Sequence, residues 1–289
     1  MQRWRNIFRK GAFKMLNFED VVNAHGMNSL NSFTKYPSIQ TYHEINSGTL
    51  KENLTDNMGF CDENVYITEK VDGTNGRILI LNGDYIIGSR EELLYRKGDM
   101  FGNPSQGIVD IMKPFAEYLV TRIPTDNTMY VFYGEVYGSN INGAKQYTKH
   151  KNSNVRFFDC IKMSAENPEF FNVLTKPIEQ ISSWREHGGQ KYVSVAEFLN
   201  LMESFGYKEN NIVPYIRFTN GLEIPTTRKE TYDWLKNFER SRAVIDKDFF
   251  ENGNNSKAEG VVVRNEIRSF IRKIRFEDYE KTIKKFGSL

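Results

Sequence analysis

Residues 65–90 read VYITEKVDGTNGRILILNGDYIIGSR, and this stretch decides the fold. Residues 65–70 are rich in β-branched and aromatic side chains, which favour strands. The following segment, Asp-Gly-Thr-Asn-Gly at 72–76, has the composition of a turn. The Asn-Gly pair at 82–83 lies between two apolar runs, the strongest short-range signal of a β-hairpin. The sequence therefore predicts three consecutive strands joined by tight turns.

Further strands and helices are predicted along the chain. Strand-like runs cover 129–137, 155–163, 259–264 and 269–276. Capping boxes begin at Ser194 and Thr227 and predict helices that extend to about Gly206 and Arg240. Apolar spacing predicts another helix over 108–122, which Pro114 must break or restart. Residues 164–193 give no clear signal. Together these elements predict an α+β fold of mostly antiparallel strands with a few packed helices.

The composition excludes several classes of protein. The 289 residues are 39% hydrophobic and 26% charged, which is typical of a globular chain. The longest apolar stretches, such as 78–81, are far too short to span a bilayer, so no membrane association is expected. Two cysteines without CxxC spacing and four scattered histidines argue against a disulfide framework and a cysteine or histidine metal site. A cytoplasmic setting is the default expectation.

Charge is nearly balanced, with 39 Lys and Arg residues against 37 Asp and Glu residues. Any nucleic-acid role must therefore depend on local basic patches. Residues 1–14 are basic but lack the apolar core of a signal peptide. Residues 139–158 contain no acidic residue, and they predict a nucleic-acid backbone patch made of Lys145, Lys149, Lys151 and Arg156. The alternative is a solvated loop with an accidental charge bias.

Lys70 is the candidate nucleophile. It lies where a predicted strand ends and a glycine-containing turn begins, a geometry that can hold an amine rigidly beside a phosphate. Nearby cations or desolvation can convert a lysine amine into a covalent nucleophile. For this short segment alone, an ordinary turn with a surface lysine remains the alternative.

Six short motifs, in order, resemble those of the covalent nucleotidyltransferases, the superfamily of ATP-dependent DNA ligases, RNA ligases and mRNA capping enzymes. Residues 69–76 resemble motif I, and an arginine-bearing element stands at 87–90. The others are 131–138, similar to motif III, 155–159, similar to the motif with a base-stacking aromatic residue, 258–263, similar to motif IV, and 271–275, similar to motif V. Their order and spacing agree from about residue 33 to residue 276. The sequence around Lys70 and the segment TKYPSI at 34–39 are most similar to those of the RNA ligase 2 family. This family includes phage RNA ligase 2 and the trypanosome RNA-editing ligases.

The resemblance implies an ATP-grasp-like nucleotidyltransferase (adenylyltransferase) fold and an ATP-dependent RNA ligase, a phosphoric-ester-forming enzyme. It would join 5′-phosphate and 3′-hydroxyl ends through a lysyl-AMP intermediate, in RNA repair. The implied cofactors are ATP, as AMP donor, and Mg²⁺ or Mn²⁺. The implied partners are RNA ends in a nicked or bridged duplex, in the cytoplasm or, for a phage-encoded protein, the host cytoplasm.

The same resemblance divides the chain into a basic N-terminal arm with a short helix at 1–32 and an adenylation domain at 33–289. No C-terminal oligonucleotide-binding or helical domain is expected. The grip on the substrate must then come from the N-terminal arm, from the basic patch or from a partner protein.

The resemblance also assigns a role to each candidate site residue. Lys70 would receive AMP, while Lys273 and Arg275 would stabilise the α-phosphate and help keep Lys70 unprotonated. Glu135 would bind the ribose, Phe158 would stack on adenine, and Glu259 would also hold the metal. The full set expected to bind the nucleotide is Glu69, Asn75, Arg90, Glu135, Phe158 and Glu259.

The residues themselves support part of this assignment. Alternate side chains of a strand share a face, so Lys273 and Arg275 point one way while Ile274 and Phe276 face the core. Glu135 stands among apolar residues, where an unpaired carboxylate is unfavourable. A ribose hydroxyl, a metal or a buried cation is its expected partner, and a structural salt bridge is the alternative.

Two other functions stay open. A minimal DNA ligase core is one, because Asp72 stands where phage RNA ligase 2 has histidine, and aspartate is the choice of DNA ligases. Arg275 also replaces the usual lysine of motif V, so its contact must differ in detail. The other is a nucleotide-binding module that has lost catalysis. The simultaneous presence of Lys70, Glu135, Glu259 and Lys273 argues against it.

Overall fold

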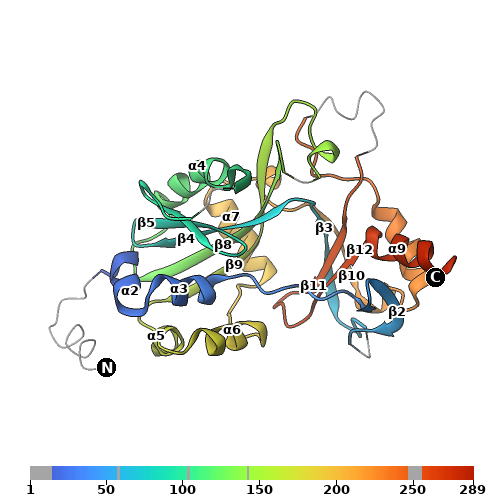
Figure 1. Ribbon diagram of the computed structural model, residues 1–289, viewed down its shortest axis with the longest axis horizontal. Coiled ribbons are helices and arrows are strands. Elements are labelled where there is room, and N and C mark those ends of the chain that lie inside the picture. The colour runs from blue at the N-terminus through green and yellow to red at the C-terminus, as the bar shows by residue number, and fades with distance from the viewer. Residues whose placement is uncertain (1–14, 57–58, 103–104, 142, 247–255) are drawn as a thin grey trace.

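The computed structural model describes residues 15–56, 59–102, 105–141, 143–246 and 256–289. In these segments the strands form sheets of six, four and two strands, and every pairing between named strands is antiparallel. Helices pack around the sheets (Figure 1). The α+β prediction is therefore confirmed. The basic segment 1–14 lies outside the described residues.

The largest sheet has the strand order β7-β6-β5-β4-β8-β9. Its strands are β4 (Thr74–Leu81), β5 (Asp84–Ser89), β6 (Leu93–Arg96), β7 (Asp99–Met100), β8 (Thr128–Gly138) and β9 (Ser153–Ser164). Asn82 and Gly83, between β4 and β5, have φ angles of 47° and 78°. Two successive positive φ angles are what a two-residue hairpin turn requires, so the Asn-Gly prediction is confirmed.

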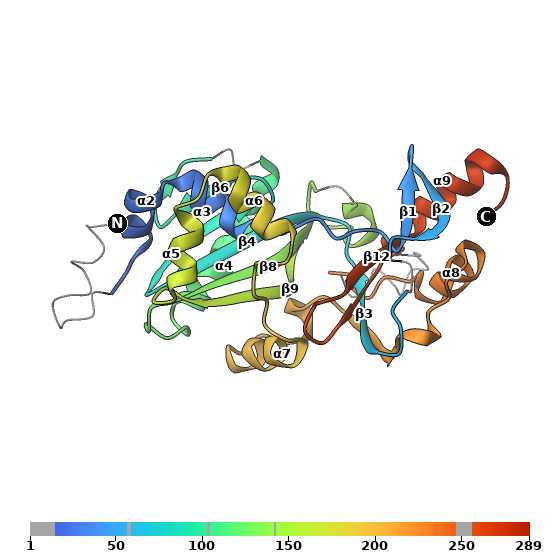
Figure 2. The ribbon, with the colours of Figure 1, turned by 90° about the horizontal axis from the view of Figure 1, so that it is seen from below.

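Helices cover both faces of this sheet. Ile78 and Ile80 of β4 face α4 (Ile108–Val120) and α7 (Val195–Ser204). Leu79 and Leu81 face the opposite layer, which consists of α2 (Phe18–His25), α3 (Met27–Thr34), α5 (Pro168–Leu174) and α6 (Ile178–Glu186). Figure 2 shows α7 on one side of the sheet and α3, α5 and α6 on the other. Burial on both faces explains why β4 reads as a continuous apolar run.

The second sheet has the order β10-β3-β11-β12. Its strands are β3 (Asn64–Lys70), β10 (Tyr215–Asn220), β11 (Gly260–Asn265) and β12 (Ile271–Arg275). One face packs on α8 (Arg228–Leu235) and α9 (Phe276–Phe286), with Ile274 and Phe276 buried as predicted. A small hairpin, β1 (His43–Asn46) and β2 (Thr49–Leu54), joins α9 through a hydrogen bond of 2.9 Å from the Leu50 amide to the Thr282 hydroxyl.

The chain crosses from the second sheet to the first at Val71–Gly73. The three predicted strands exist, but β3 and β4 belong to different sheets, so their connection is not a hairpin turn. Residues 74–76, predicted as part of that turn, instead begin β4. Gly73 is required here because a Cβ atom would lie 2.3 Å from the Val136 carbonyl oxygen. The crossing leaves Lys70 at the boundary between the sheets.

Two further differences concern helices. α4 continues through Pro114 without a break, contrary to the prediction. The exposed proline removes one backbone hydrogen bond, but Met112, Ala116 and Leu119 are fully buried against the sheet and hold the helix together. α5 and α6 occupy the region 164–193, for which no element was predicted.

Both helix N-caps are confirmed, each through the hydroxyl half of the predicted capping box. The Glu197 amide donates to the Ser194 hydroxyl over 3.1 Å, and the Glu230 amide to the Thr227 hydroxyl over 3.3 Å. None of the helices in the described part of the chain combines the length and apolarity needed to cross a bilayer.

Candidate active site

A cavity of about 380 Å³ lies between the two larger sheets. This volume is within the range of small-molecule sites. All of the residues predicted to bind nucleotide or to act in catalysis line it: Glu69, Lys70, Asn75, Arg90, Glu135, Phe158, Glu259, Lys273 and Arg275. The structure thus brings residues from both sheets and from separate parts of the sequence into one place.

Strand register explains how the cations meet. Gly260 of β11 pairs with Lys70 on one side and with Arg275 on the other. Two residues further along β11, Val262 pairs with Thr68 and Lys273. Lys70, Lys273 and Arg275 therefore project from one face of the sheet toward the cavity, as alternation predicts. The Gly260 position has no room for a side chain, because a Cβ atom would lie 2.1 Å from the Ile274 carbonyl oxygen.

Glu259 balances part of this positive charge. Its carboxylate accepts a hydrogen bond from Nζ of Lys70. Nη1 of Arg275 lies 3.7 Å from the other carboxylate oxygen, and Arg275 also makes two hydrogen bonds, of 2.9 and 2.7 Å, to Asp278. Burial, together with Arg275 and Lys70, lowers the pKa of Lys273. This end of the cavity is therefore suited to an anionic group such as a phosphate chain.

The middle of the cavity is lined by two polar side chains, Glu135 and Asn75. Burial raises the pKa of Glu135 to about 7, against the opposing effect of Lys70. Asn75 pairs with Glu135 across the strands, and its Oδ1 atom is buried without a hydrogen-bond partner. Within the described segments Glu135 forms no ion pair, which disfavours the structural salt bridge considered from sequence. A buried amide oxygen without a partner, beside a carboxylate, suits a ligand with hydroxyl groups.

Phe158 stands at the opposite end from Lys70, and a β-bulge explains its orientation. Tyr133 of β8 pairs with Asp159, but Gly134 pairs with Phe157, so Phe158 is the extra residue of β9. Such a bulge can redirect a side chain next to a functional site. Phe158 is half-buried, lines the cavity and packs edge-on against Tyr36 with ring centroids 5.1 Å apart. This end of the cavity is suited to a flat aromatic group.

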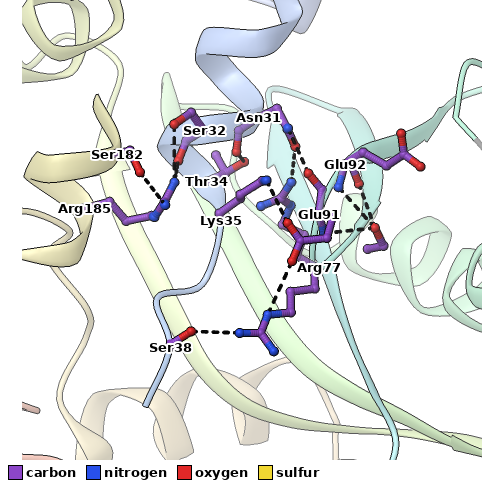
Figure 3. Close-up of polar contacts among 12 residues, drawn as sticks. Asn31, Ser32, Thr34, Lys35, Ser38, Arg77, Glu91, Glu92, Ser182 and Arg185 are labelled. Carbon is purple, nitrogen blue, oxygen red and sulfur yellow. Dashed lines mark hydrogen bonds and ion pairs between the residues drawn. The ribbon is translucent and has the colours of Figure 1, made fainter. Parts of the chain in front are cut away.

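Arg90 lies at the rim on the turn that follows β5. Its Nη2 atom donates to the Ser38 hydroxyl over 2.8 Å, and its Nε atom is 3.6 Å from the Glu91 carboxylate. The same carboxylate forms an ion pair of 3.0 Å with Lys35, at the end of α3 (Figure 3). The Asn31 amide also donates to the Glu91 carbonyl over 3.0 Å. The turn with Arg90 is therefore anchored to α3 and to the segment that follows it.

Two predicted residues do not lie as expected. The Glu69 carboxylate accepts hydrogen bonds from the Ser241 hydroxyl and the Arg242 amide, so its acidic group is turned away from the cavity. Alternation along β3 is the reason, because Glu69 and Lys70 occupy opposite faces. Arg156 is 5% exposed and donates to the Glu209 and Ile212 carbonyls over 2.6 and 2.9 Å. Its assignment to a surface patch is therefore wrong.

The other three members of the predicted patch, Lys145, Lys149 and Lys151, are exposed. Their segment contacts the turn after Lys70, since the Asp72 amide donates to the Tyr147 hydroxyl over 2.7 Å. The patch is thus adjacent to the cavity.

Metal binding by protein groups alone is not supported. Among the described residues there is no cluster of three or more His, Cys, Asp or Glu side chains suited to an ion. Magnesium, however, is usually held by one or two carboxylates together with substrate phosphates. Glu259 and Asp72, which both line the cavity, fit that second arrangement.

Sequence reasoning missed Arg264. It lines the cavity near Phe158, it is 5% exposed, and its Nη2 atom has no hydrogen-bond partner. A cation that follows three valines in a strand was a usable signal, by the same argument that singled out Glu135.

The α+β fold is the one that the resemblance implies, and Lys70 lies at the sheet boundary on the same sheet face as Lys273 and Arg275. A model of the RNA ligase family matches residues 63–285, so the chain belongs to the RNA ligase family. The predicted membership of an RNA ligase family is thereby confirmed. A comparison with curated proteins finds no match.

Among solved structures, this chain is similar to those of the Naegleria gruberi RNA ligase. A mutant with ATP and Mn is 14% identical, with a TM-score of 0.47 over 85% of this chain and 61% of that chain. A mutant with AMP and Mn is 15% identical, with a TM-score of 0.49 over 97% of this chain and 71% of that chain. The ligase with PPi is 14% identical, with a TM-score of 0.46 over 99% and 71%. This chain therefore spans 61% to 71% of the length of those ligases.

Proposed function

We propose that this protein is an ATP-dependent RNA ligase that joins 5′-phosphate and 3′-hydroxyl ends through AMP bound covalently to Lys70. One observation carries the proposal. The Lys70 amine is held by Glu259 at the positive end of a nucleotide-sized cavity, with Lys273 and Arg275 on the same sheet face. The adenylation domain is proposed to cover residues 33–289, and RNA repair in the cytoplasm is the proposed setting.

The length of the cavity suits a nucleotide. Gly260 of β11 pairs with Lys70, and Arg264 lies four residues further along the same strand. This separation corresponds to about 13 Å. We place the phosphates at Lys70, the ribose at Glu135 and Asn75, and adenine against Phe158. We propose that Arg90, at the rim, contacts the phosphates or the ribose.

In the first step, the Lys70 Nζ lone pair attacks the α-phosphorus of ATP. The N–P bond forms as the bond from the α-phosphorus to the bridging oxygen breaks, and pyrophosphate leaves. The proton lost by Lys70 has a route through its hydrogen bond to Glu259. Lys273 and Arg275 stabilise the charge that develops on the α-phosphate. A divalent cation, Mg²⁺ or Mn²⁺, held by Glu259 and Asp72, supplies further neutralisation when bound.

In the second step, a 5′-phosphate oxygen of the RNA attacks the same phosphorus. The P–N bond breaks, Lys70 is regenerated, and the RNA carries a 5′,5′-linked AMP. In the third step, the 3′-hydroxyl attacks the RNA 5′-phosphorus, a phosphodiester forms, and AMP leaves. The proposed substrate is a nicked or bridged RNA duplex, which a partner protein helps to hold.

Lys145, Lys149, Lys151 and Arg242 are proposed to contact the RNA backbone. These exposed cations lie on two segments that are held together by Asp246. Its carboxylate is buried and accepts hydrogen bonds of 2.8, 2.7 and 2.7 Å from the Thr148 hydroxyl, the Lys149 amide and the Asn152 amide group. The acidic group therefore points inward while the cations point outward, which favours a phosphate backbone.

The direct test is incubation with α-labelled ATP or GTP, followed by addition of nicked duplexes. Label transferred to the protein from ATP, and then sealing of a nick whose 3′-hydroxyl strand is RNA, is expected. ATP binding without covalent label would indicate an inactive module. Equal sealing of an all-DNA nick would favour the DNA-ligase alternative, because the 2′-hydroxyl is what distinguishes RNA.

A further inference from the structure

Arg268 lies in the turn between β11 and β12, outside the residues that line the cavity. Its backbone φ is 58°, which is uncommon for a residue other than glycine. Its side chain is only 10% exposed. A long charged residue buried at the tip of a hairpin, in an unfavourable backbone conformation, needs strong contacts elsewhere.

Those contacts come from the other sheet and its covering segments. The Arg268 guanidinium lies 3.8 Å from the ring centroid of Tyr192 and 4.8 Å from that of Tyr36. Its Nε atom is 2.9 Å from the Asp159 carboxylate and donates to the Tyr36 hydroxyl over 3.3 Å. Asp159 belongs to β9 of the six-stranded sheet. Arg268 therefore fastens the β11–β12 hairpin to the opposite wall of the cavity.

Two partners of Arg268, Asp159 and Tyr36, adjoin or touch Phe158. Asp159 follows Phe158 directly and forms the paired end of the bulge. Tyr36 donates its hydroxyl hydrogen to Asp159 over 2.9 Å and packs against the Phe158 ring. Asp159 is fully buried, and its second cationic partner, Arg264, is 3.2 Å away. Removal of Arg268 leaves a buried carboxylate with one cation instead of two, and it removes the guanidinium from the Tyr36 ring and hydroxyl.

We propose that Arg268 is a positioning residue that fixes Phe158 and Tyr36 at the base end of the cavity and so sets the affinity for the nucleoside part of the nucleotide. The inference rests on the proposed function, since it needs the nucleotide to occupy this cavity. The phosphate end does not depend on Arg268, because Lys70 and Arg275 are held by Glu259 and Asp278 instead.

Arg272 provides a matched control on the same hairpin. Its side chain is 13% exposed, pairs with the single carboxylate of Asp56 and lies 4.9 Å from the ring centroid of Phe270. Burial, ion pair and aromatic contact thus resemble those of Arg268. Arg272 does not line the cavity and does not contact Phe158 or Tyr36. A merely structural effect of losing a buried arginine should appear equally in both variants.

Calorimetric titration of the full chain with AMP and, separately, with pyrophosphate tests the proposal. Arg268→Ala should weaken AMP binding about tenfold or more and change pyrophosphate binding less than about twofold. Arg268→Lys should be intermediate, since it keeps the charge but not the flat stacking on Tyr192. If the alanine variant does not fold, the lysine variant carries the test. Arg272→Ala should bind both ligands as the wild type does.

Three results would overturn the inference. These are unchanged AMP binding in the Arg268 variants, equal losses for AMP and pyrophosphate, or an equal loss of AMP binding in Arg272→Ala. Failure of the wild type to bind AMP or to become labelled by ATP would instead refute the proposed function, and the inference with it. In adenylylation kinetics, Arg268→Ala should raise KM for ATP more than it lowers kcat.

Discussion

Replacing Glu135 by glutamine should remove a pH-dependent loss of stability. Burial raises the pKa of this carboxyl from its ordinary value of 4.5 to about 7. Below pH 4.5 the group is protonated in both the folded and the unfolded chain. Between pH 4.5 and 7 the unfolded chain ionises first, so the free energy of unfolding falls, and above pH 7 the loss is constant. The full loss amounts to about 3 kcal/mol.

Glutamine has the same size and stays neutral, so the Glu135→Gln protein lacks this loss. The free energy of unfolding of the variant, relative to the wild type, should therefore rise by about 2 kcal/mol between pH 5 and pH 8. Urea denaturation of both proteins at several pH values, without nucleotide, measures the difference. Glu203→Gln, at an exposed carboxylate on α7, controls for the removal of one negative charge. A wild-type-to-variant difference that stays constant from pH 5 to pH 8 would refute the reasoning.

The remaining predictions concern binding and catalysis. If the nucleotide ribose donates hydrogen bonds to ionised Glu135, AMP binding near pH 6 should release a proton, which calorimetry in buffers of different ionisation enthalpy detects. Lys273→Ala should slow adenylylation by about 10² to 10³, as measured with labelled ATP, while Arg275→Lys should be milder because it keeps the positive charge. Joint replacement of Lys145, Lys149 and Lys151 by alanine should lower the salt slope of RNA binding by about two to three without slowing adenylylation. An unchanged salt slope would remove these lysines from the RNA surface.

Local patterns were sufficient where local chemistry determines structure. The Asn-Gly turn at 82–83, the helix N-caps at 194 and 227 and the alternation of 273–275 were all correct, because each depends on neighbouring residues. The predicted site residues come from motifs that are far apart in the sequence, and all of them line one cavity.

The predictions were wrong where contacts between distant parts of the chain determine the structure. Pro114 remains helical because the sheet holds α4 from one side. Arg156 was assigned to the surface by its charge, although carbonyls of residues 209 and 212, more than fifty positions away, bury it. Arg268 gave no signal, since its partners come from three separate segments of the sequence. The sheet change after Lys70 was missed because residues 72–76 have the composition of an ordinary turn.

The central claim is that Lys70 becomes covalently linked to AMP and passes that AMP to an RNA end. The most direct measurement is mass spectrometry of the protein after incubation with ATP and Mg²⁺, with peptide mapping, followed by addition of a 5′-phosphorylated nicked duplex. The account predicts one AMP on the wild type, located on Lys70 and lost when the duplex is added, and no AMP on Lys70→Ala. AMP on another residue, or on Lys70→Ala to the same extent, would contradict it.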